Sequence, residues 1–341
     1  MRTDEKDGSA MRVGVIGPVF QDSFAENIAM GLEAFGASAY RLGPAQHRSR
    51  RKVVNHSIHA LSKAFPATLE LTQRRLTRRA AELELDAVIT VQAWLLPSAV
   101  TAMRRSGTKV CLWYPDAVSN LPTSIALSPF DAIFSKEPAL VDRLSRTLRL
   151  PAHYLPQACN PAWHRVPADV DDGPCDAAGH IVVAGNVYGT RARILSLLLD
   201  HQVPLQIYGG PMPRLITDGR IHKAHTGRYI ARADKARVFR RAAGVLNSMH
   251  PAEIDGVNSR LFEAAGCGAA VLTEHRREVP NLFRPGDEVL SFHDFDELLG
   301  HIKMLVDEPS TARALGDAAT ARAHADHTYD KRLARLLEIL I

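Results

Sequence analysis

The chain has few aromatic residues and no long hydrophobic run, and each shortage excludes a class of protein. Phe, Trp and Tyr make up only 6% of the 341 residues, which argues against a stacking surface for single-stranded nucleic acid. No apolar segment approaches the roughly 20 residues that a bilayer-spanning helix needs. Residues 1–10 are polar and charged and lack the apolar centre of a signal peptide. We therefore expect a chain without a transmembrane segment, and a disordered tail at residues 1–10.

Cysteine is also scarce. The four cysteines show no paired spacing of the kind that indicates a zinc site or a disulfide framework, and they are Cys111, Cys159, Cys175 and Cys267. The histidines are scattered, without a ligand-like pair on one helix face. The sequence therefore predicts a protein of the reducing cytoplasm with no metal site.

Positive charge is in modest excess and is concentrated in one stretch. The net charge is +5 and the isoelectric point is about 9.1. The basic residues of that stretch are Arg48, Arg50, Arg51, Lys52, Lys63, Arg74, Arg75, Arg78 and Arg79. The simpler interpretation is the solvated face of one or two helices. The alternative is a surface for an acidic acceptor, which would be a phosphate-bearing glycan, an anionic membrane or nucleic acid.

The first half of the chain alternates apolar strands with helices. Residues 12–17 form a buried strand that ends at a glycine turn, and residues 23–35 place apolar side chains at helical spacing. Further strands are predicted at residues 87–91, 109–114, 132–135 and 153–155. Strands with helices between them predict a parallel, doubly wound sheet.

The alternation stops between residues 161 and 179, where Pro, Gly and Asp accumulate, and then restarts. A chain of 341 residues is long enough for two domains. We predict an N-terminal domain at residues 11–157, a linker at 158–178, a C-terminal domain at 179–325 and a final helix at 326–341.

The most informative segment is Asn258–Thr273, which predicts a short helix that ends at glycine and leads into a buried strand. Asn258 or Ser259 can cap the helix. Glu263 is the one acid among small and apolar residues, and a buried carboxylate needs a fixed partner. Ribose hydroxyls are such a partner, because an ionised carboxylate accepts two hydrogen bonds. The alternative is an ordinary acid on the helix surface.

This segment resembles the donor-binding signature of GT-B glycosyltransferases, and the chain as a whole resembles the spore-maturation-protein-B-like (CgeB-like) family. In related enzymes two acids lie eight positions apart; Glu263 matches the second and Asp255 stands at the first, where Glu is usual. The other matching segments are Phe130–Phe134, Leu155–Pro161, Gly185–Arg191 and His327–Arg332.

The resemblance implies an α/β protein of the GT-B fold, with two Rossmann-like domains facing across a cleft and the last helix packed back on the first domain. It implies a transferase that moves a sugar from a nucleotide sugar, with UDP-sugar as the expected donor and no separate cofactor. The N-terminal domain would bind the acceptor and the C-terminal domain the donor. The acceptor stays open among small molecules, glycans, proteins and nucleic acids.

The expected donor-binding residues are those that can stabilise the negative charge that develops on the leaving group. The diphosphate is the leaving group, so prepositioned donors beside it accelerate transfer. The turn at Gly185 and Asn186 precedes a helix whose first amides can hold phosphate, and Arg191 can pair with it. Arg260 lies three positions before Glu263 on the same helix face and can neutralise the diphosphate. Asp255 and Asn258, just before the Glu263 helix, are further expected donor contacts. So are Tyr208 and Gly209, at a strand end where the base would dock.

The acceptor residues are expected after strands of the first half. Asp22, in the loop that begins at Gly17, and Asp116, after Pro115, are the two candidates for a catalytic base. Gly17 and Ser23 would border the acceptor, although a helix cap explains Ser23 equally well. Asp116 can equally be a turn residue.

Three alternatives stay open. An Asp-x-Asp pair holds a metal in the other major glycosyltransferase fold, but Asp169/Asp171 fall in the linker and Asp294/Asp296 at a helix start, so we expect solvated or capping residues and metal-independent transfer. A nucleotide-sugar epimerase can share the fold. A non-catalytic nucleotide-sugar-binding or scaffold protein would also keep Glu263 and Arg260. Retention or inversion is not decided by the sequence.

Overall fold

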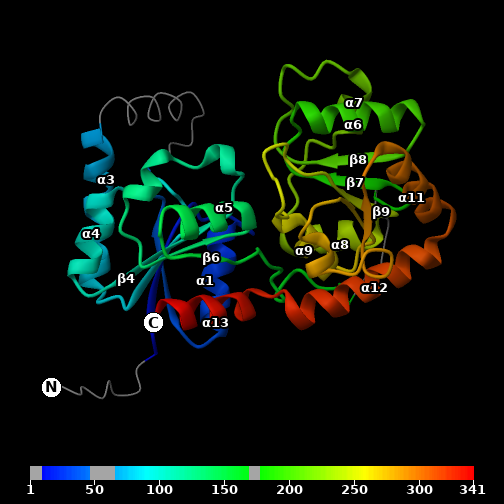
Figure 1. The fold of residues 1–341 in the computed structure, drawn as a ribbon. Helices are drawn as coiled ribbons and strands as arrows, with labels where there is room; N and C mark the ends of the chain where they lie inside the picture. The colour runs from blue at the N-terminus through cyan, green and yellow to red at the C-terminus, as the bar shows by residue number, and fades with distance from the viewer. Residues whose placement is uncertain (1–9, 47–65, 169–176) are drawn as a thin grey trace. The chain divides into compact units, whose positions relative to one another are not determined.

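The structure is a computed structural model that describes residues 10–46, 66–168 and 177–341. The chain divides into two compact units, with Met1–Leu155 and Asp330–Ile341 in unit 1 and Pro156–Tyr329 in unit 2. Each unit is built on one parallel sheet with helices packed against it (Figure 1). Unit 1 has the strand order β2-β1-β3-β4-β5-β6 and unit 2 the order β11-β10-β9-β7-β8.

Unit 1 alternates strands and helices as the hydrophobic pattern predicts. Its strands are β1 (Arg12–Ile16), β2 (Ser38–Gly43), β3 (Ala87–Thr90), β4 (Lys109–Tyr114), β5 (Ala132–Ser135) and β6 (Ala152–Tyr154). Its helices are α1 (Phe24–Ala34), α3 (Pro66–Glu82), α4 (Pro97–Arg105), α5 (Pro138–Asp142) and, from Asp330 on, α13 (Tyr329–Leu340). The weakly apolar β2 pairs with β1 in parallel, and the hydrophobic pattern did not reveal it.

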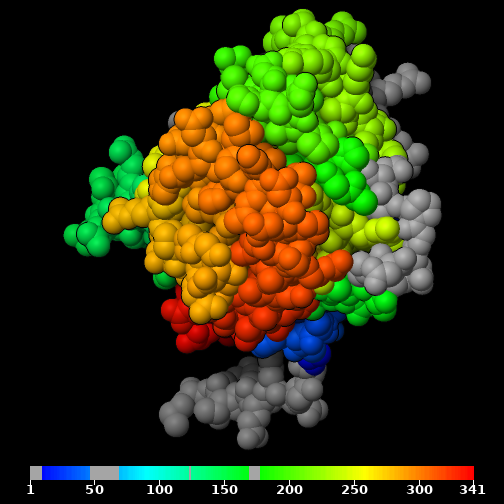
Figure 2. Space-filling model, turned by 90° about the vertical axis from the view of Figure 1, so that its right-hand side faces the viewer, coloured from blue at the N-terminus to red at the C-terminus, as the bar shows by residue number. Residues whose placement is uncertain are grey.

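Unit 2 repeats this architecture. Its strands are β7 (Ile181–Ala184), β8 (Leu205–Tyr208), β9 (Gly244–Asn247), β10 (Val271–Glu274) and β11 (Leu290–Phe292). Its helices are α6 (Gly189–Asp200), α7 (Gly219–Ala224), α8 (Arg232–Arg241), α9 (Ser259–Gly266), α10 (Val279–Leu282), α11 (Phe295–Asp307) and α12 (Pro309–Asp326). Helices α11 and α12, in orange tones, cover much of one face of this unit (Figure 2).

Both faces of the unit 2 sheet are covered, which explains why its strands are continuously apolar. Val182 and Ala184 of β7 belong to a core that includes residues of α8, α9 and α12. Ile181 and Val183 point to the opposite core, which includes residues of α6, α7 and α11. Because side chains of a strand point alternately to its two faces, β7 contributes to two separate hydrophobic layers.

The first residues of the predicted linker pack inside unit 2. Ala158, Cys159 and His164 are fully buried, and Cys159 forms a parallel bridge with Thr328. A Cβ atom on Gly266 would lie only 2.9 Å from the backbone oxygen of His164, so α9 needs glycine where this segment crosses it. The later pair Asp169/Asp171, and Cys175, lie outside the described residues.

The basic stretch is described only in part. Arg48, Arg50, Arg51, Lys52 and Lys63 lie outside the described residues. Its four remaining arginines are exposed on α3, whereas Leu76 and Ala80 of the same helix are buried. In α3 the stretch is therefore the solvated face of an amphipathic helix.

Candidate functional site

The glycine turn after β7 lies between two guanidinium groups. Gly185 has φ +124°, a backbone conformation that favours glycine. A Cβ atom at this position would lie 3.5 Å from Nη1 of Arg191 and 4.0 Å from Nη2 of Arg260. Two motifs 75 residues apart in sequence therefore meet at this turn. In the unit 2 sheet, β7 lies between β8 and β9. The chain passes from β7 to β8 on one side of β7 and later adds β9 on its other side. The turn after β7 therefore lies at the point where the strand order reverses, which is where open α/β sheets bind ligands.

Arg191 fixes the geometry of that switch point. Its Nη1 donates to the backbone oxygen of Asn186 at 2.7 Å, while Nε and Nη2 donate to Oγ and the backbone oxygen of Ser248 at 2.8 and 2.7 Å. It thereby ties the turn after β7 to the residue after β9. Burial lowers the pKa of Arg191, and the positive charge of Arg260 lowers it further. Arg191 is buried, with only 8% of its surface exposed.

The start of α6 offers free backbone donors. Tyr188 is the N-cap residue, and its side chain makes no capping hydrogen bond. Gly189 and Thr190 are exposed. Uncapped first-turn amides at the positive end of a helix are a ready site for an anionic group. The exposed Asn186 lies beside this helix start.

Glu263 is held by two cations inside unit 2. It is only 6% exposed, and its Oε2 accepts from Lys235 Nζ at 3.0 Å and from Arg260 Nη1 at 2.5 Å. The interpretation of Glu263 as an acid on the helix surface is therefore wrong. The structure supplies partners other than a ribose, and Lys235 of α8 was missed because it lies 28 positions away in a strongly charged helix. Its one available signal was its place on the apolar face of α8, beside Ala236 and Phe239.

The cluster carries excess positive charge. Lys235, Arg191 and Arg260 supply three cations, and Glu263 is the acid that pairs directly with two of them. The guanidinium of Arg260 also lies over the ring of Phe239, 5.4 Å from its centroid. Such a cluster suits a ligand with more than one negative charge.

Tyr208 and Gly209 have structural roles. The Tyr208 ring is 1% exposed, and its hydroxyl donates to Gln206 Oε1 at 2.6 Å, so the ring does not offer a free face to a base. A Cβ atom on Gly209 would lie 2.4 Å from the backbone oxygen of Gly185. Glycine is therefore required for β7 and β8 to end side by side.

Asn258 caps α9 as predicted, since its side chain accepts from the backbone N–H of Arg260 at 3.0 Å. Asp255 is half-buried in the loop before α9, and its backbone oxygen accepts from Glu278. The neighbouring Glu253 is buried and accepts from the backbone N–H of His250 at 3.0 Å. The two acids eight positions apart therefore come from a loop and a helix.

In unit 1, three predicted residues shape the turn after β1. Ser23 caps α1 by accepting from the N–H of Glu26 at 3.2 Å. Asp22 is 6% exposed, has φ +62°, and accepts from Asn27 Nδ2 at 3.0 Å. A Cβ atom on Gly17 would lie 2.5 Å from Val91 Cγ2. These contacts give each of the three a structural role at the carboxyl edge of the sheet.

Asp116 differs because it is exposed, in the loop after β4. The nearby Tyr114 hydroxyl donates to the backbone oxygen of Ala117 at 3.0 Å, and burial, with the charge of Asp116, raises the Tyr114 pKa. Asp116 and Asp22 follow strands that are separated by β3 at the same sheet edge.

Asp294 is a helix cap, because its carboxylate accepts from the N–H of Glu297 at 2.9 Å. Within residues 10–46, 66–168 and 177–341, no three His, Cys, Asp or Glu side chains are grouped so that they could hold a metal ion. No helix in the part of the chain that the structure describes is long and apolar enough to cross a membrane.

Comparison with known protein families finds a match over part of the chain. Residues 191–338, which include Arg191, Lys235, Arg260 and Glu263, match a family described as glycosyl transferase-like. Comparison with curated proteins finds no match.

The whole chain is similar in fold to solved glycosyltransferase structures. Sucrose-phosphate synthase from Thermosynechococcus elongatus has a TM-score of 0.67 and 14% identity, covering 96% of this chain and 98% of that one. Anabaena Alr3699/HepE in complex with UDP has a TM-score of 0.66 and 13% identity, covering 96% and 100%. Its complex with UDP-glucose has a TM-score of 0.64 and 12% identity, covering 96% and 99%. The prediction of the GT-B fold with two Rossmann-like sheets is confirmed.

Proposed function

We propose that the chain is a glycosyltransferase that takes a sugar from a nucleotide sugar, with a UDP-sugar as donor. The observation that carries the proposal is the meeting of Arg191, Arg260 and the uncapped start of α6 around Gly185. The glycosyl transferase-like match covers residues 191–338, so it includes Arg191 and Arg260 but begins after Gly185 and after the first two residues of α6. The UDP and UDP-glucose complexes of the Anabaena protein, which has the same fold, support the choice of nucleotide. The CgeB-like family is the closest description that the sequence motifs suggest.

The diphosphate would lie at the turn after β7. Cleavage of the bond between the sugar and the diphosphate leaves an added negative charge on the leaving group. Arg260 and the free amides of α6 would stabilise that charge where it develops. Arg191 would hold the turn in place while its remaining N–H groups face the phosphate. Because these groups supply positive charge, we propose transfer without a metal ion.

Glu263 would bind the ribose through its carboxylate, whose Oε2 is held by Lys235 and Arg260. Both cations keep the carboxylate ionised and fix its orientation. Asp255, in the loop before α9, would approach the sugar. Asn186 and the backbone of Gly209 would border the nucleotide.

Unit 1 would bind the acceptor, and residues 179–325, which were predicted from the sequence as the donor domain and lie within unit 2, would bind the donor. Asp116 is the stronger candidate for a base, because Asp22 is buried against Asn27. Gly17 and Ser23 would support the acceptor loop through packing and capping. The three described cysteines are free and buried, which fits a reducing compartment such as the cytoplasm.

The test is calorimetric titration of the full chain with UDP, UDP-glucose, GDP and ADP, with and without EDTA. We expect UDP or its sugar conjugate to bind with or without EDTA, and Arg260→Ala to weaken binding by about tenfold or more, since charge-assisted hydrogen bonds contribute about 1.5–3 kcal/mol each. Arg193→Ala, an exposed cation on α6, is the matched control. Absence of binding in a folded sample, or equal binding by the Arg260 variant, would contradict the proposal. Release of an isomerised free sugar nucleotide would instead indicate an epimerase.

A further inference from the structure

A pocket opens at the edge of the unit 2 sheet opposite the turn at Gly185. It has a volume of about 290 Å³ and is lined by residues that precede strands, namely Gly179 before β7, Ala243 before β9 and Ala270 before β10. The turn at Gly185 follows β7, so the two places are separated by the length of the strand. The pocket is therefore distinct from the proposed donor site.

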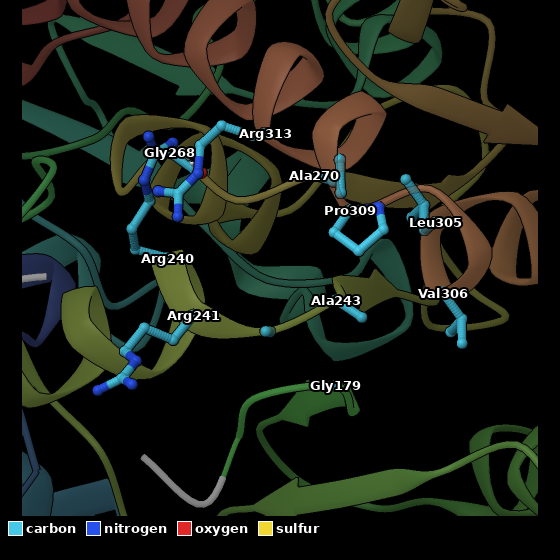
Figure 3. A pocket seen from close by; sticks show the side chains of 12 residues that line it. Gly179, Arg240, Arg241, Ala243, Gly268, Ala270, Leu305, Val306, Pro309 and Arg313 are labelled. Carbon is cyan, nitrogen blue, oxygen red and sulfur yellow. Dashed lines mark hydrogen bonds between the residues drawn. The ribbon is translucent and has the colours of Figure 1, made fainter. Parts of the chain in front are cut away.

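The pocket has a basic side and an apolar side (Figure 3). Arg240, Arg241 and Arg313 lie on one side, and Leu305, Val306 and Pro309 on the other. Among the residues that the structure describes, the lining contains three arginines and no acidic residue. Clusters of arginine attract carboxylate or phosphate groups, while the facing aliphatic side chains favour an apolar body.

The protein's own contacts hold the basic side in place. Arg240 Nη1 donates to the backbone oxygen of Gly268 at 2.8 Å, and its Nη2 pairs with Asp317 at 2.7 Å. Gly268 has φ +77°, and a Cβ atom there would lie 2.7 Å from Arg240 Nη1. The missing side chain leaves room for the Arg240 guanidinium to fold back against the wall.

Arg313 is the cation most open to a ligand. It is exposed on the first turn of α12, and it has no ion-pair partner among the residues that the structure describes. Pro309 and Ala312 of the same turn also line the pocket. The amino-terminal end of an 18-residue helix adds its positive dipole to this side.

We propose that this pocket binds a small organic anion, a phosphate monoester or carboxylate whose apolar body packs on Leu305, Val306 and Pro309. The site is independent of the proposed transferase activity. The anionic group would pair with Arg313, and the small side chains of Ala243 and Ala270 leave the space for the body.

The experiment is titration calorimetry of the full chain with four probes: phenyl phosphate, benzoate, inorganic phosphate and phenol. Phenyl phosphate and benzoate share an apolar ring and differ in their anionic group. Inorganic phosphate lacks the ring, and phenol lacks the anionic group. We expect phenyl phosphate or benzoate to bind more tightly than phosphate or phenol. Arg313→Ala should weaken that binding by about tenfold. Val306→Glu, which places a carboxylate on the apolar side at a partly exposed position, should abolish it.

Two controls keep the result specific. Lys303→Ala removes an exposed cation from α11 without touching the pocket lining and should leave binding unchanged. Arg260→Ala tests whether the probe enters the donor site instead. Binding that depends on Arg260 and not on Arg313, or no binding of any probe at millimolar concentration, would overturn the proposal.

Discussion

At the scale of single residues, Lys235 and Glu263 form a buried pair whose members depend on each other. Each is less than 10% exposed at the side chain, and the Nζ to Oε2 distance is 3.0 Å. Removing one partner of a buried ion pair leaves an uncompensated charge and costs about 3–5 kcal/mol. Because Arg260 still pairs with Glu263, we expect Lys235→Met to lower the free energy of unfolding in urea titrations by less than that amount.

The double variant Lys235→Met/Glu263→Leu separates stability from binding. It removes both charges, so we expect it to be more stable than Lys235→Met. UDP binding should stay lost, because the carboxylate proposed for the ribose is absent. A double variant no more stable than Lys235→Met would show that the pair is not energetically coupled.

His275 gives a pH-dependent contribution to stability. Its ring stacks on His293 with centroids 4.1 Å apart, and burial, followed by the charges of His293 and Arg276, lowers its pKa against the opposing effect of Glu297. The unfolded chain therefore binds more protons than the folded one just below the ordinary pKa of 6.5. We expect stability to be fully present above that pH and to fall as the pH drops from about 6.5 towards the lower folded pKa.

Urea midpoints measured between about pH 5 and 8 test this sign. The slope against pH should flatten in His275→Gln, which keeps a polar planar group without titrating. His201→Gln is the matched control, because the His201 ring packs on Phe295 rather than on a second histidine. An unchanged slope in the His275 variant would contradict the assignment.

At the scale of elements, the ends of β7 and β8 lie so close together that there is no room for a side chain at Gly209. Alanine at Gly209 would place Cβ 2.4 Å from the backbone oxygen of Gly185, and backbone has little freedom to shift. We expect Gly209→Ala to destabilise the protein by about 1–3 kcal/mol. Thermal unfolding followed by circular dichroism measures the change.

Gly189→Ala is the matched control for that variant. It lies at the start of α6, where an added Cβ meets nothing within 4 Å, so the substitution should be neutral or stabilising by up to about 1 kcal/mol. Equal destabilisation by both variants would show that helix or turn propensity, rather than the close approach of two strands, sets the cost.

At the scale of the whole molecule, the chain returns to unit 1 after completing unit 2. Residues Asp330–Ile341 belong to unit 1, and Leu333 and Leu336 on α13 are fully buried. We expect a chain truncated after Tyr329 to lose stability in unit 1, while unit 2 retains UDP binding. Calorimetric unfolding should then show two separated transitions, of which only the upper one shifts with UDP.

Glu338→Ala is the control for the truncation, because that side chain is 67% exposed on the same helix and forms a surface ion pair with Arg335. It should leave the unfolding profile unchanged. A single transition in the truncated chain, shifted throughout by UDP, would show that the two units unfold together.

The sequence by itself determined the architecture. Period-two and period-3.6 hydrophobic patterns predict the buried strands β1, β4 and β7 and the helix α1, because local burial is encoded by neighbouring residues. The caps at Ser23, Asn258 and Asp294 were equally readable, since capping is a contact between residues three positions apart or fewer. These signals, with the motif around Glu263, were enough to predict the GT-B fold.

Only the tertiary structure decided what the charged and glycine residues contact. Lys235 meets Glu263 across 28 positions, Arg191 spans from the turn after β7 to Ser248 after β9, and Gly209 meets Gly185. No local pattern encodes such pairs, because they arise from the order of strands in the sheet. The same holds for the pocket at Arg313, whose walls come from loops and helices that converge at the amino edge of β7, β9 and β10. Sequence fixes which face of an element is buried, whereas the sheet topology determines which side chains meet there.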